Sequence, residues 1–484
     1  MSIDIDQVLS QVPRGQFIGG RWVTGDATFE VLNPATGAAL TTVCDGTPDD
    51  ARAALDAACA AADEWAATEP RVRAEVLRRA FELIDERKET FAALMTLEMG
   101  KPLAESEGEV SYGAEFFRWF SEETCRMEGR WTTAPLGGNR LLTMKQPVGP
   151  VYAITPWNFP LAMGTRKIGP ALAAGCTVVI KPASATPLTM LHLMQALQDA
   201  GVPDGVVNCV VSSKSSDVSK PILSDPRLRK LTFTGSTEVG VKLLEQASQN
   251  VLRTSMELGG NAPFLVLRDA DVAAAVKGAM PAKFRNNGEA CTAANRFYVH
   301  RDLVEDFQAQ LVAEVEKLVV GPGADEGTTL GPLVDQDTLD KVAELTEDAV
   351  AKGARVLTGG NRLDREGFFF APTVLTDVPR DARLLKEEIF GPVAPIVVVE
   401  SDDEAIAAAN DTEFGLMSYV FAEGLTSGLT AVEQIESGMV ALNTGVVSNP
   451  AAPFGGMKHS GLGREGSHEG LEEYLETKYV GIGL

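Results

Sequence analysis

The amino-acid sequence predicts an α/β fold with two parallel sheets and a small β flap. Short β-branched runs alternate with helical segments after Gly149, and a Gly259-Gly260 break divides this alternation into two blocks. One β-prone hairpin fits neither block. Alternation of strands and helices at this spacing is typical of parallel sheets with right-handed crossovers. The length of 484 residues indicates about three domains.

The N-terminal part is predicted to be helical. Thr47 and Pro48 can begin a helix over residues 47–67, because the threonine can cap it and proline suits the first helical position. A longer helix is expected over residues 71–99, with Gly100 as its stop signal.

The two blocks are assigned from their periodicity. In the first block we expect strands at 151–155, 177–180, 206–211 and 231–234, and helices at 161–174, after Pro187, and at 238–248. In the second block we expect strands at 263–267, 297–300, 355–357, 395–399, 419–422 and 439–442, and helices at 272–284, 304–318, 403–410 and 426–436.

Two segments are expected outside the sheets. Residues 128–146 read as a hairpin with a Gly137-Gly138-Asn139 turn, and residues 474–484 end the chain as a strand. A terminal strand offers an edge that another subunit could cover. An edge closed within the same chain is an equally good interpretation.

Composition limits the function classes. The apolar fraction of 45% allows a sizeable core, and the net charge of −24 argues against a nucleic-acid partner. No apolar run approaches the roughly 18 residues that a membrane span needs. Residues 1–6 lack the features of a secretory signal, so we expect a cytoplasmic protein. The six cysteines form no Cys-x-x-Cys pair, so neither a metal site nor a disulfide framework is expected.

Two residues carry the predicted chemistry. Cys291 lies in a loop of small and polar residues, and Glu257 ends an apolar stretch just before two glycines. A thiol nucleophile and a separate carboxylate base suit a covalent mechanism with a hydrolytic second half. A thiol near its reference pKa of about 8.5 is a few per cent thiolate at neutral pH. Cys291 could instead be an inert, packed cysteine, and Glu257 could be a solvated residue at the end of a strand.

A series of short motifs carries a family resemblance. They are NPATG at 33–37, TPWNFP at 155–160, KPAS at 181–184, FTGST at 233–237, ELGGN at 257–261, GEACTAANR at 288–296, EEIFGP at 387–392 and PFGG at 453–456. With these motifs in this order, the chain resembles the NAD(P)-dependent aldehyde dehydrogenase superfamily over essentially its whole length.

The resemblance implies two Rossmann-like domains and an oligomerisation flap. The cofactor-binding domain would span 1–127 and 147–257, the catalytic domain 258–459, and the oligomerisation segments 128–146 and 460–484. A homodimer or homotetramer is expected on the same ground.

The resemblance also assigns catalytic roles. Cys291 would attack the aldehyde, giving a thiohemiacetal and then a thioester, and Glu257 would activate the water that hydrolyses it. Asn158 would donate to the developing oxyanion, together with the Cys291 N–H, as oxyanion-hole donors do. Asn158 could instead be a turn-forming residue before Phe-Pro, with no part in catalysis.

The expected cofactor is NADP, with NAD possible. The turn at Gly235 does not match the G-x-G-x-x-G pattern, but a helix N-terminus after a strand can still receive a pyrophosphate. Ser184 occupies a position that is often glutamate in NAD-preferring relatives, and serine does not repel a 2′-phosphate. The cofactor-binding set that we assign is Trp157, Lys181, Pro182, Ala183, Ser184, Gly235, Ser236, Leu258, Glu388 and Phe390.

Within the superfamily the chain resembles the succinate-semialdehyde dehydrogenases. By that similarity Arg166, Arg285 and Ser448 would hold the distal carboxylate of the substrate succinic semialdehyde, since guanidinium groups bind carboxylates bidentately. The arginines could instead lie on solvated helix faces. Three other functions remain open: a dehydrogenase of glutarate semialdehyde or another short ω-carboxy aldehyde, a cysteine hydrolase or acyltransferase, and a non-catalytic protein on this fold.

Overall fold

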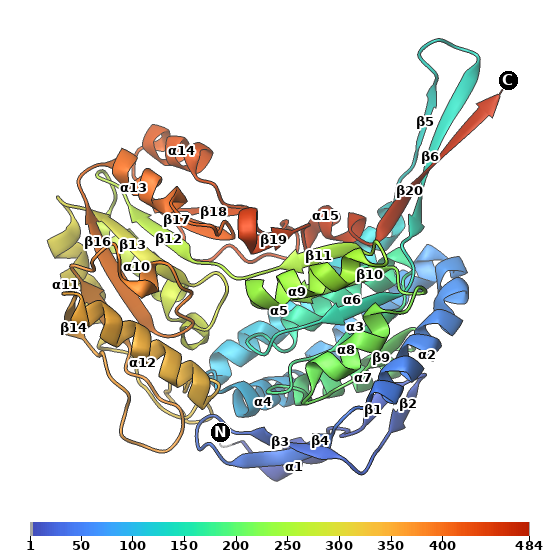
Figure 1. Cartoon of the computed structure of the whole chain (residues 1–484), viewed down its shortest axis with the longest axis horizontal. Helices are drawn as coiled ribbons and strands as arrows, with labels where there is room; N and C mark the ends of the chain where they lie inside the picture. The colour runs from blue at the N-terminus through green and yellow to red at the C-terminus, as the bar shows by residue number, and fades with distance from the viewer. Residues whose placement is uncertain (1–2, 484) are drawn as a thin grey trace.

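The computed structural model describes residues 3–483 and contains two α/β lobes, with a narrow three-stranded sheet projecting from one of them (Figure 1). Met1 and Ser2 of the N-terminal stretch, and Leu484 of the expected terminal strand, lie outside the described residues. Within residues 3–483, none of the helices combines the length and the apolar character that crossing a bilayer requires.

The first sheet has eight strands in the order β19-β11-β10-β7-β8-β9-β1-β2. Its five central strands are parallel, and β1, β2 and β19 pair antiparallel at its margins. The four strands predicted in the first block are confirmed. The bounds are β1 Gln16–Ile18, β2 Arg21–Val23, β7 Val151–Ile154, β8 Val178–Lys181, β9 Val207–Cys209, β10 Lys230–Thr234, β11 Arg253–Glu257 and β19 Gly461–Leu462.

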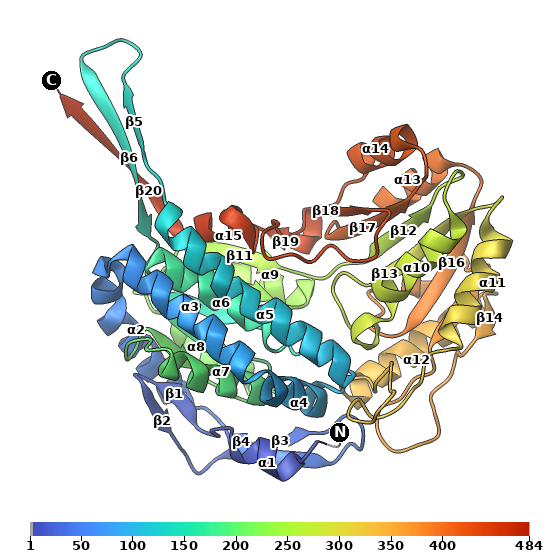
Figure 2. The same ribbon diagram turned by 180° about the vertical axis from the view of Figure 1, so that it is seen from behind.

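Helices cover both faces of this sheet, because its central strands are apolar on both sides. Val151 and Ala153 of β7 pack on one side, and Tyr152 packs on the other. Figure 2 shows α3 and α5 crossing in front of the first of these faces. That face carries α3 Pro70–Glu86, α4 Lys88–Met99, α5 Leu103–Glu123, α6 Ala162–Ala174 and α7 Leu188–Asp199, and the opposite face α2 Pro48–Ala67, α8 Ser215–Leu223 and α9 Thr237–Ser248.

The second sheet has seven strands in the order β14-β15-β16-β13-β12-β17-β18, parallel except for β14. The six strands predicted in the second block are confirmed, and β15 was not predicted. The strands are β12 Ala262–Val266, β13 Ala294–His300, β14 Arg355–Thr358, β15 Thr373–Thr376, β16 Val393–Val399, β17 Met417–Phe421 and β18 Met439–Leu442. One face packs on α10 Val272–Lys283 and α11 Val304–Val315, and the other on α12 Gln336–Ala351, α13 Asp402–Asn410 and α14 Leu425–Gln434.

Two helical predictions have different outcomes. The helix over 47–67 is confirmed as α2, and Thr47 and Asp50 cap it reciprocally through bonds of 2.8 and 3.2 Å. The single helix over 71–99 is wrong, because Arg87 leaves helical geometry (φ −104°, ψ 19°) and separates α3 from α4. Neither glycine nor proline marks this break, so the sequence pattern runs through it.

The predicted hairpin and the terminal strand form one projecting flap. The flap comprises β5 Arg130–Thr133, β6 Asn139–Pro147 and β20 Leu475–Gly483, in the order β20-β6-β5 (Figure 1). Strand β20 pairs with β6 of the same chain along its whole length, so this side of the terminal strand is closed internally. Its other side remains at the margin of the flap.

The remaining elements lie near the two ends of the chain. Helix α1 Ile5–Ser10 precedes β1, and β3 Thr28–Leu32 pairs with β4 Ala39–Cys44 in a separate two-stranded sheet. The short helix α15 Ser467–Glu472 connects β19 to the flap.

Candidate active site

The site lies where the first sheet reverses its strand order. The chain runs from β7 through β8 to β9 in one direction and then returns to place β10 and β11 on the other side of β7. Ligands of open α/β sheets bind outside the carboxyl ends of the strands at such a switch point. Asn158 and Gly235 lie in the loops that follow β7 and β10, and Glu257 is the last residue of β11.

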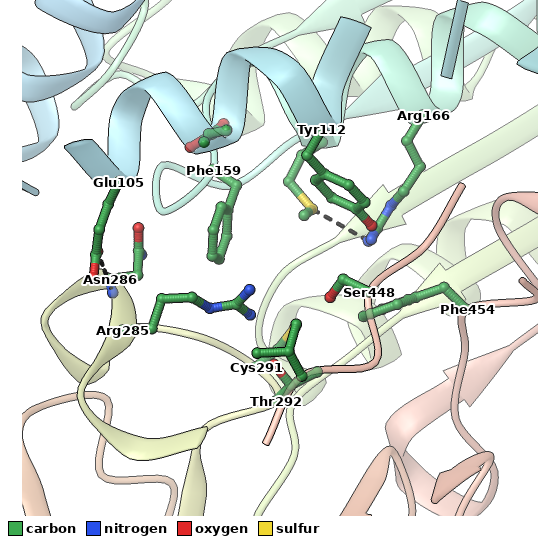
Figure 3. Close-up of a pocket in the computed structure, with 14 residues that line it drawn as sticks. Glu105, Tyr112, Phe159, Arg166, Arg285, Asn286, Cys291, Thr292, Ser448 and Phe454 are labelled. Carbon is green, nitrogen blue, oxygen red and sulfur yellow. Dashed lines mark hydrogen bonds between the residues drawn. The ribbon is translucent and has the colours of Figure 1, made fainter. Parts of the chain in front are cut away.

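The first cavity, of about 250 Å³, brings the expected substrate residues together. Its lining includes Cys291, Arg166, Arg285 and Ser448 (Figure 3). They come from four separate segments, namely the loop before β13, helix α6, the turn after α10 and the loop after β18.

Arg166 is held firmly in the wall of this cavity. Only 1% of its surface is exposed, so the interpretation of a solvated helix face is wrong for this residue. Its Nε forms an ion pair with Glu465, and its guanidinium lies 4.2 Å from the centroid of the Phe454 ring. Glu465 also pairs with Lys167, so two cationic side chains share one carboxylate in this buried cluster. This arrangement suits an anionic ligand.

Arg285 enters the cavity from a left-handed turn. Asn286 and Asn287 have φ of 56° and 59°, and Gly288 follows with φ 78°. The left-handed conformation costs a non-glycine residue roughly 1–2 kcal/mol, so surrounding bonds must hold it. The Asn287 side chain accepts from Gly331 N (2.7 Å) and donates to the Pro332 carbonyl (2.8 Å).

The turn needs glycine at position 288. A Cβ there would collide with the carbonyl of Gly391, in addition to the positive φ. The close approach packs the turn against the segment that contains Glu388 and Phe390.

Cys291 lies between the first cavity and a second one. Its half-buried side chain lines both, as does Met163. Removal from water raises the pKa of its thiol to about 12, although the positive charges of Arg166 and Arg285 oppose the shift. Burial therefore disfavours the thiolate of Cys291 more strongly than in a free thiol of reference pKa.

The second cavity, of about 230 Å³, contains most of the expected cofactor residues. The Trp157 and Phe390 rings meet edge to face, with centroids 5.4 Å apart. Glu388 accepts a hydrogen bond from Gly260 N (3.4 Å), and burial raises its pKa to about 7. The predicted residues in its lining are Trp157, Asn158, Gly235, Ser236, Glu257, Leu258, Cys291, Glu388 and Phe390.

Glu257 is buried at the end of β11 rather than solvated. Neither carboxylate oxygen has a hydrogen-bond partner within residues 3–483. Burial, reinforced by the negative charge of Glu465, raises the pKa of Glu257 well above its usual value, while Arg166 and Lys167 oppose the shift. A carboxyl with a raised pKa is a stronger base than an ordinary carboxylate once it is ionised.

Asn158 is anchored to the segment before Cys291. Its Nδ2 donates to the Glu289 carbonyl (3.0 Å), and its own carbonyl accepts from Lys101 (2.7 Å) and Asn286 Nδ2 (3.1 Å). Since an amide nitrogen has two N–H groups, one remains available to an oxygen in the second cavity.

The start of α9 fits the phosphates of a dinucleotide. Ser236 caps this helix by accepting from Val239 N (3.4 Å). A Cβ at Gly240 would collide with Leu258, so glycine allows α9 to approach the end of β11. A further cavity of about 570 Å³ lies between α8 and α9 and is lined by Ile154, Phe233 and several serines and lysines. A helix N-terminus beside a largely apolar pocket suits a pyrophosphate and an adenosine.

The KPAS motif lies beside these cavities rather than in their linings. Lys181 ends β8, and its Nζ donates to the Pro182 carbonyl (2.9 Å). Burial lowers the pKa of Lys181 to about 8. Ala183 and Ser184 follow and are half-buried.

Several residues of the site were missed by sequence reasoning. Glu105, Glu109 and Tyr112 line the first cavity from α5, a helix that was not predicted. Their spacing places them on one helix face, and that pattern could have identified them. Burial raises the pKa of the Tyr112 hydroxyl, against the effect of Arg166 beside it (Figure 3). Glu465, the ion-pair partner of Arg166, was also missed, because no local sequence pattern marks it as a site residue.

Comparison with known proteins places these observations in a family. The profile of the Aldehyde dehydrogenase family matches residues 22–480. The chain is 56% identical over 443 residues to the succinate-semialdehyde dehydrogenase of Paenarthrobacter nicotinovorans, covering 92% of this chain and 98% of that protein. It is 50% identical to the NADP(+)-linked succinate-semialdehyde dehydrogenase of Escherichia coli strain K12 (96% and 97% covered).

Two further matches bear on substrate and fold. The chain is 49% identical to a glutarate-semialdehyde dehydrogenase of Pseudomonas putida, with 97% of each chain covered. The crystal structure of an E. coli NADP-dependent enzyme superposes with a TM-score of 0.97 at 48% identity, covering 98% of this chain and 99% of that one.

Proposed function

The chain belongs to the aldehyde dehydrogenase family, and on that premise we propose that it oxidises succinic semialdehyde to succinate with NADP, NAD serving as a second acceptor. The observation that carries this proposal is the convergence of Arg166, Arg285 and Ser448 on the cavity that contains the Cys291 thiol. The identities of 56% and 50% to two succinate-semialdehyde dehydrogenases support the same substrate.

The distal carboxylate of the substrate is bound by the two guanidinium groups and the Ser448 hydroxyl. Arg166 cannot turn away, because Glu465 and Phe454 hold it. Anchoring the anion fixes the aldehyde carbon at the thiol and converts a bimolecular encounter into an oriented one. Charge-assisted bonds of this kind are roughly twice as strong as neutral ones.

Oxidation begins at the Cys291 sulfur. The thiol loses its proton to solvent water, the sulfur bonds to the carbonyl carbon, and the carbonyl oxygen becomes an oxyanion that accepts from Asn158 Nδ2 and the Cys291 N–H. Hydride would leave this thiohemiacetal carbon for the acceptor that a bound dinucleotide supplies, the carbonyl would re-form, and a thioester would remain on Cys291. Glu257 then takes a proton from water, whose oxygen displaces the sulfur and releases succinate. The raised pKa of Glu257 makes it a competent proton acceptor once it is ionised.

The residues present fit a nicotinamide dinucleotide, which when bound supplies the hydride acceptor. Gly235, Ser236 and the start of α9 would bind its pyrophosphate, and Leu258 would line the second cavity beside them. Glu388 would accept from the nicotinamide ribose, between Trp157 and Phe390. Lys181, Pro182, Ala183 and Ser184 would border the adenosine ribose at the end of β8.

The preference for NADP rests on Ser184 and Lys181. Serine carries no charge to repel a 2′-phosphate, and the neighbouring lysine can attract it. The E. coli relatives described as NADP-linked support this choice.

The substrate assignment is tested by a comparison of aldehydes in wild type and Arg166→Ala. We expect wild type to prefer succinic semialdehyde to butanal, and the variant to lose about 100-fold in kcat/KM for the semialdehyde, as loss of a buried charge partner implies. Its kcat/KM for butanal should fall much less, by the smaller effect that loss of the Arg166 charge has on Cys291 and Glu257. Arg301→Ala, which removes an exposed guanidinium outside the cavity, is the control. Equal losses on both aldehydes in Arg166→Ala would refute the clamp.

The second candidate is glutarate semialdehyde. A relative at 49% identity acts on it by name, and one methylene is worth only about 1–3 kcal/mol in a pocket. A rate panel over semialdehydes of three to six carbons distinguishes the two. A maximum at five carbons would favour glutarate semialdehyde.

We also propose a homodimer or homotetramer assembled through the flap. Strands β5 and β20 of the flap are largely exposed, and Trp131 on β5 is 60% exposed. The free side of β20 offers unpaired backbone groups to a second subunit. The six free cysteines of the chain support a reducing compartment such as the cytoplasm, which cell fractionation would test.

A further inference from the structure

The two guanidinium groups of the first cavity are held in different ways. Arg166 is fixed at its side chain by the Glu465 carboxylate and the Phe454 ring. Arg285 is held less closely: within residues 3–483 it forms no ion pair, and its guanidinium lies 5.9 Å from the Phe159 ring centroid, against 4.2 Å for Arg166 and Phe454. The direction of Arg285 therefore depends on its backbone.

That backbone is held by a carboxylate from α5. Glu105 Oε2 accepts a hydrogen bond of 2.6 Å from the N–H of Asn286, the residue directly after Arg285. Figure 3 shows Glu105 and Asn286 together at one end of the cavity, with the Arg285 side chain extending toward Cys291. The bond fixes the peptide group that joins Arg285 to the left-handed turn.

We propose that Glu105 is a positioning residue that directs Arg285 at the distal anion of the substrate and so contributes to selectivity for carboxylated aldehydes. This inference rests on the proposed function. Glu105 binds the backbone N–H beside Arg285 and leaves the guanidinium donors to the ligand. A carboxylate bound to the outer guanidinium nitrogens would compete with the substrate for those donors, whereas the contact of Glu465 with Arg166 is at Nε.

Helix α5 holds the other arginine segment in a parallel way. Glu109, one turn further along, accepts from Leu161 N and Ala162 N at the start of α6, at 3.0 and 3.1 Å. Helix α6 carries Arg166. Two carboxylates on one face of α5 therefore bind the backbones of the two segments that supply the guanidinium groups, which sets the separation of these groups.

The test compares Glu105→Ala with Glu105→Gln, which keeps an oxygen acceptor. Glu107→Ala is the matched control, because Glu107 is an exposed glutamate on the same helix. In Glu105→Ala we expect KM for succinic semialdehyde to rise about tenfold, with kcat changing less than about threefold, since loss of orientation weakens anion binding. Butanal kcat/KM should stay within about threefold. Glu105→Gln should retain most of the wild-type KM, and Glu107→Ala all of it.

Two further measurements separate positioning from a general structural role. In an Arg285→Ala background, Glu105→Ala should raise KM by less than about twofold, because residues that act through one another are not additive. The Asn286 amide should exchange hydrogen faster in Glu105→Ala and in Glu105→Asp, whose shorter side chain withdraws the carboxylate.

Three results would overturn the inference: equal losses on both aldehydes, an undiminished KM increase in the Arg285→Ala background, or unchanged Asn286 exchange. A wild-type enzyme with no preference for succinic semialdehyde over butanal would refute the proposed function, and this inference with it. A wild type that has the preference, beside a Glu105→Ala variant that keeps it, would refute the inference alone.

Discussion

Burial disfavours the reactive thiolate form of Cys291, the proposed nucleophile. Burial raises the pKa of Cys291 to about 12, so its thiolate is a minor species at neutral pH. The buried Glu257 lines the second cavity with Cys291 and also has a raised pKa. Burial therefore disfavours the charged form of both groups, and the mechanism includes their ionisation.

Alkylation of Cys291 by iodoacetamide in the cofactor-free enzyme should follow this pKa. Because the pKa of Cys291 is raised, the fraction present as reactive thiolate increases about tenfold per pH unit at every pH below the pKa. We expect this increase to continue from about pH 7 to about pH 9, measured by mass spectrometry of the peptide containing Cys291. A plateau below about pH 8 would contradict it.

Replacement of Glu257 should separate oxidation from hydrolysis. Glu257→Gln removes the proton acceptor for water, so the thioester should accumulate after one hydride transfer. Stopped-flow absorbance should show a burst of about one reduced cofactor per active site, followed by a steady state reduced about 10²–10⁴-fold. A variant with full steady-state turnover would show that another group activates water.

Some residues of the site could be predicted from the sequence, and others could not. Cys291 and Glu257 stand in short motifs, Arg166 was assigned by family resemblance, and the structure brings all three to two adjoining cavities. Glu465 lies 298 positions from its partner Lys167, and no local pattern connects them. Long-range pairing of this kind is decided by tertiary packing alone.

At the scale of elements, strands were easier to predict than helix breaks. The parallel strands are buried on both faces and read as apolar runs. Arg87 interrupts α3 and α4 without a breaker residue, and α5 carries polar side chains into a cavity, which obscures its apolar periodicity. Strands β1 to β4 were not predicted either; β2, β3 and β4 are largely exposed and lack the apolar runs of the central strands.

We propose that Ser184, after the end of β8, determines the preference for NADP over NAD. Ser184→Glu places a carboxylate where a 2′-phosphate would bind, and like charges repel at short range. We expect kcat/KM for NADP to fall about 10–100-fold, with NAD little affected. Steady-state kinetics with both cofactors measures this change. A uniform loss would instead indicate damage to the fold.

At the scale of the whole molecule, the carboxyl edge of the first sheet faces the amino end of β13 in the second, and the site forms where they meet. The sequence indicated both sheets but not this arrangement, since side chains from both lobes and from the returning segment at Glu465 are needed to build it. The flap projects away from the site (Figure 1), which leaves it free for assembly.

The assembly proposal predicts a mass that is a multiple of the 51.5 kDa chain by light scattering. Trp131→Glu should weaken the assembly, because it buries a charge in the interface at a cost of several kcal/mol. Val356→Glu, an equivalent change on β14, which lies far from the flap in Figure 1, should not. A monomeric wild type would contradict the proposal.

The central claim is that the sulfur of Cys291 bonds to the aldehyde carbon before hydride leaves. The most direct measurement is the rate at which 340 nm absorbance appears with succinic semialdehyde and NADP in Cys291→Ala, with folding checked by circular dichroism. The account predicts a loss of at least about 10⁴-fold, since no other group can supply the covalent bond. Reduced cofactor produced at the wild-type rate would contradict the account.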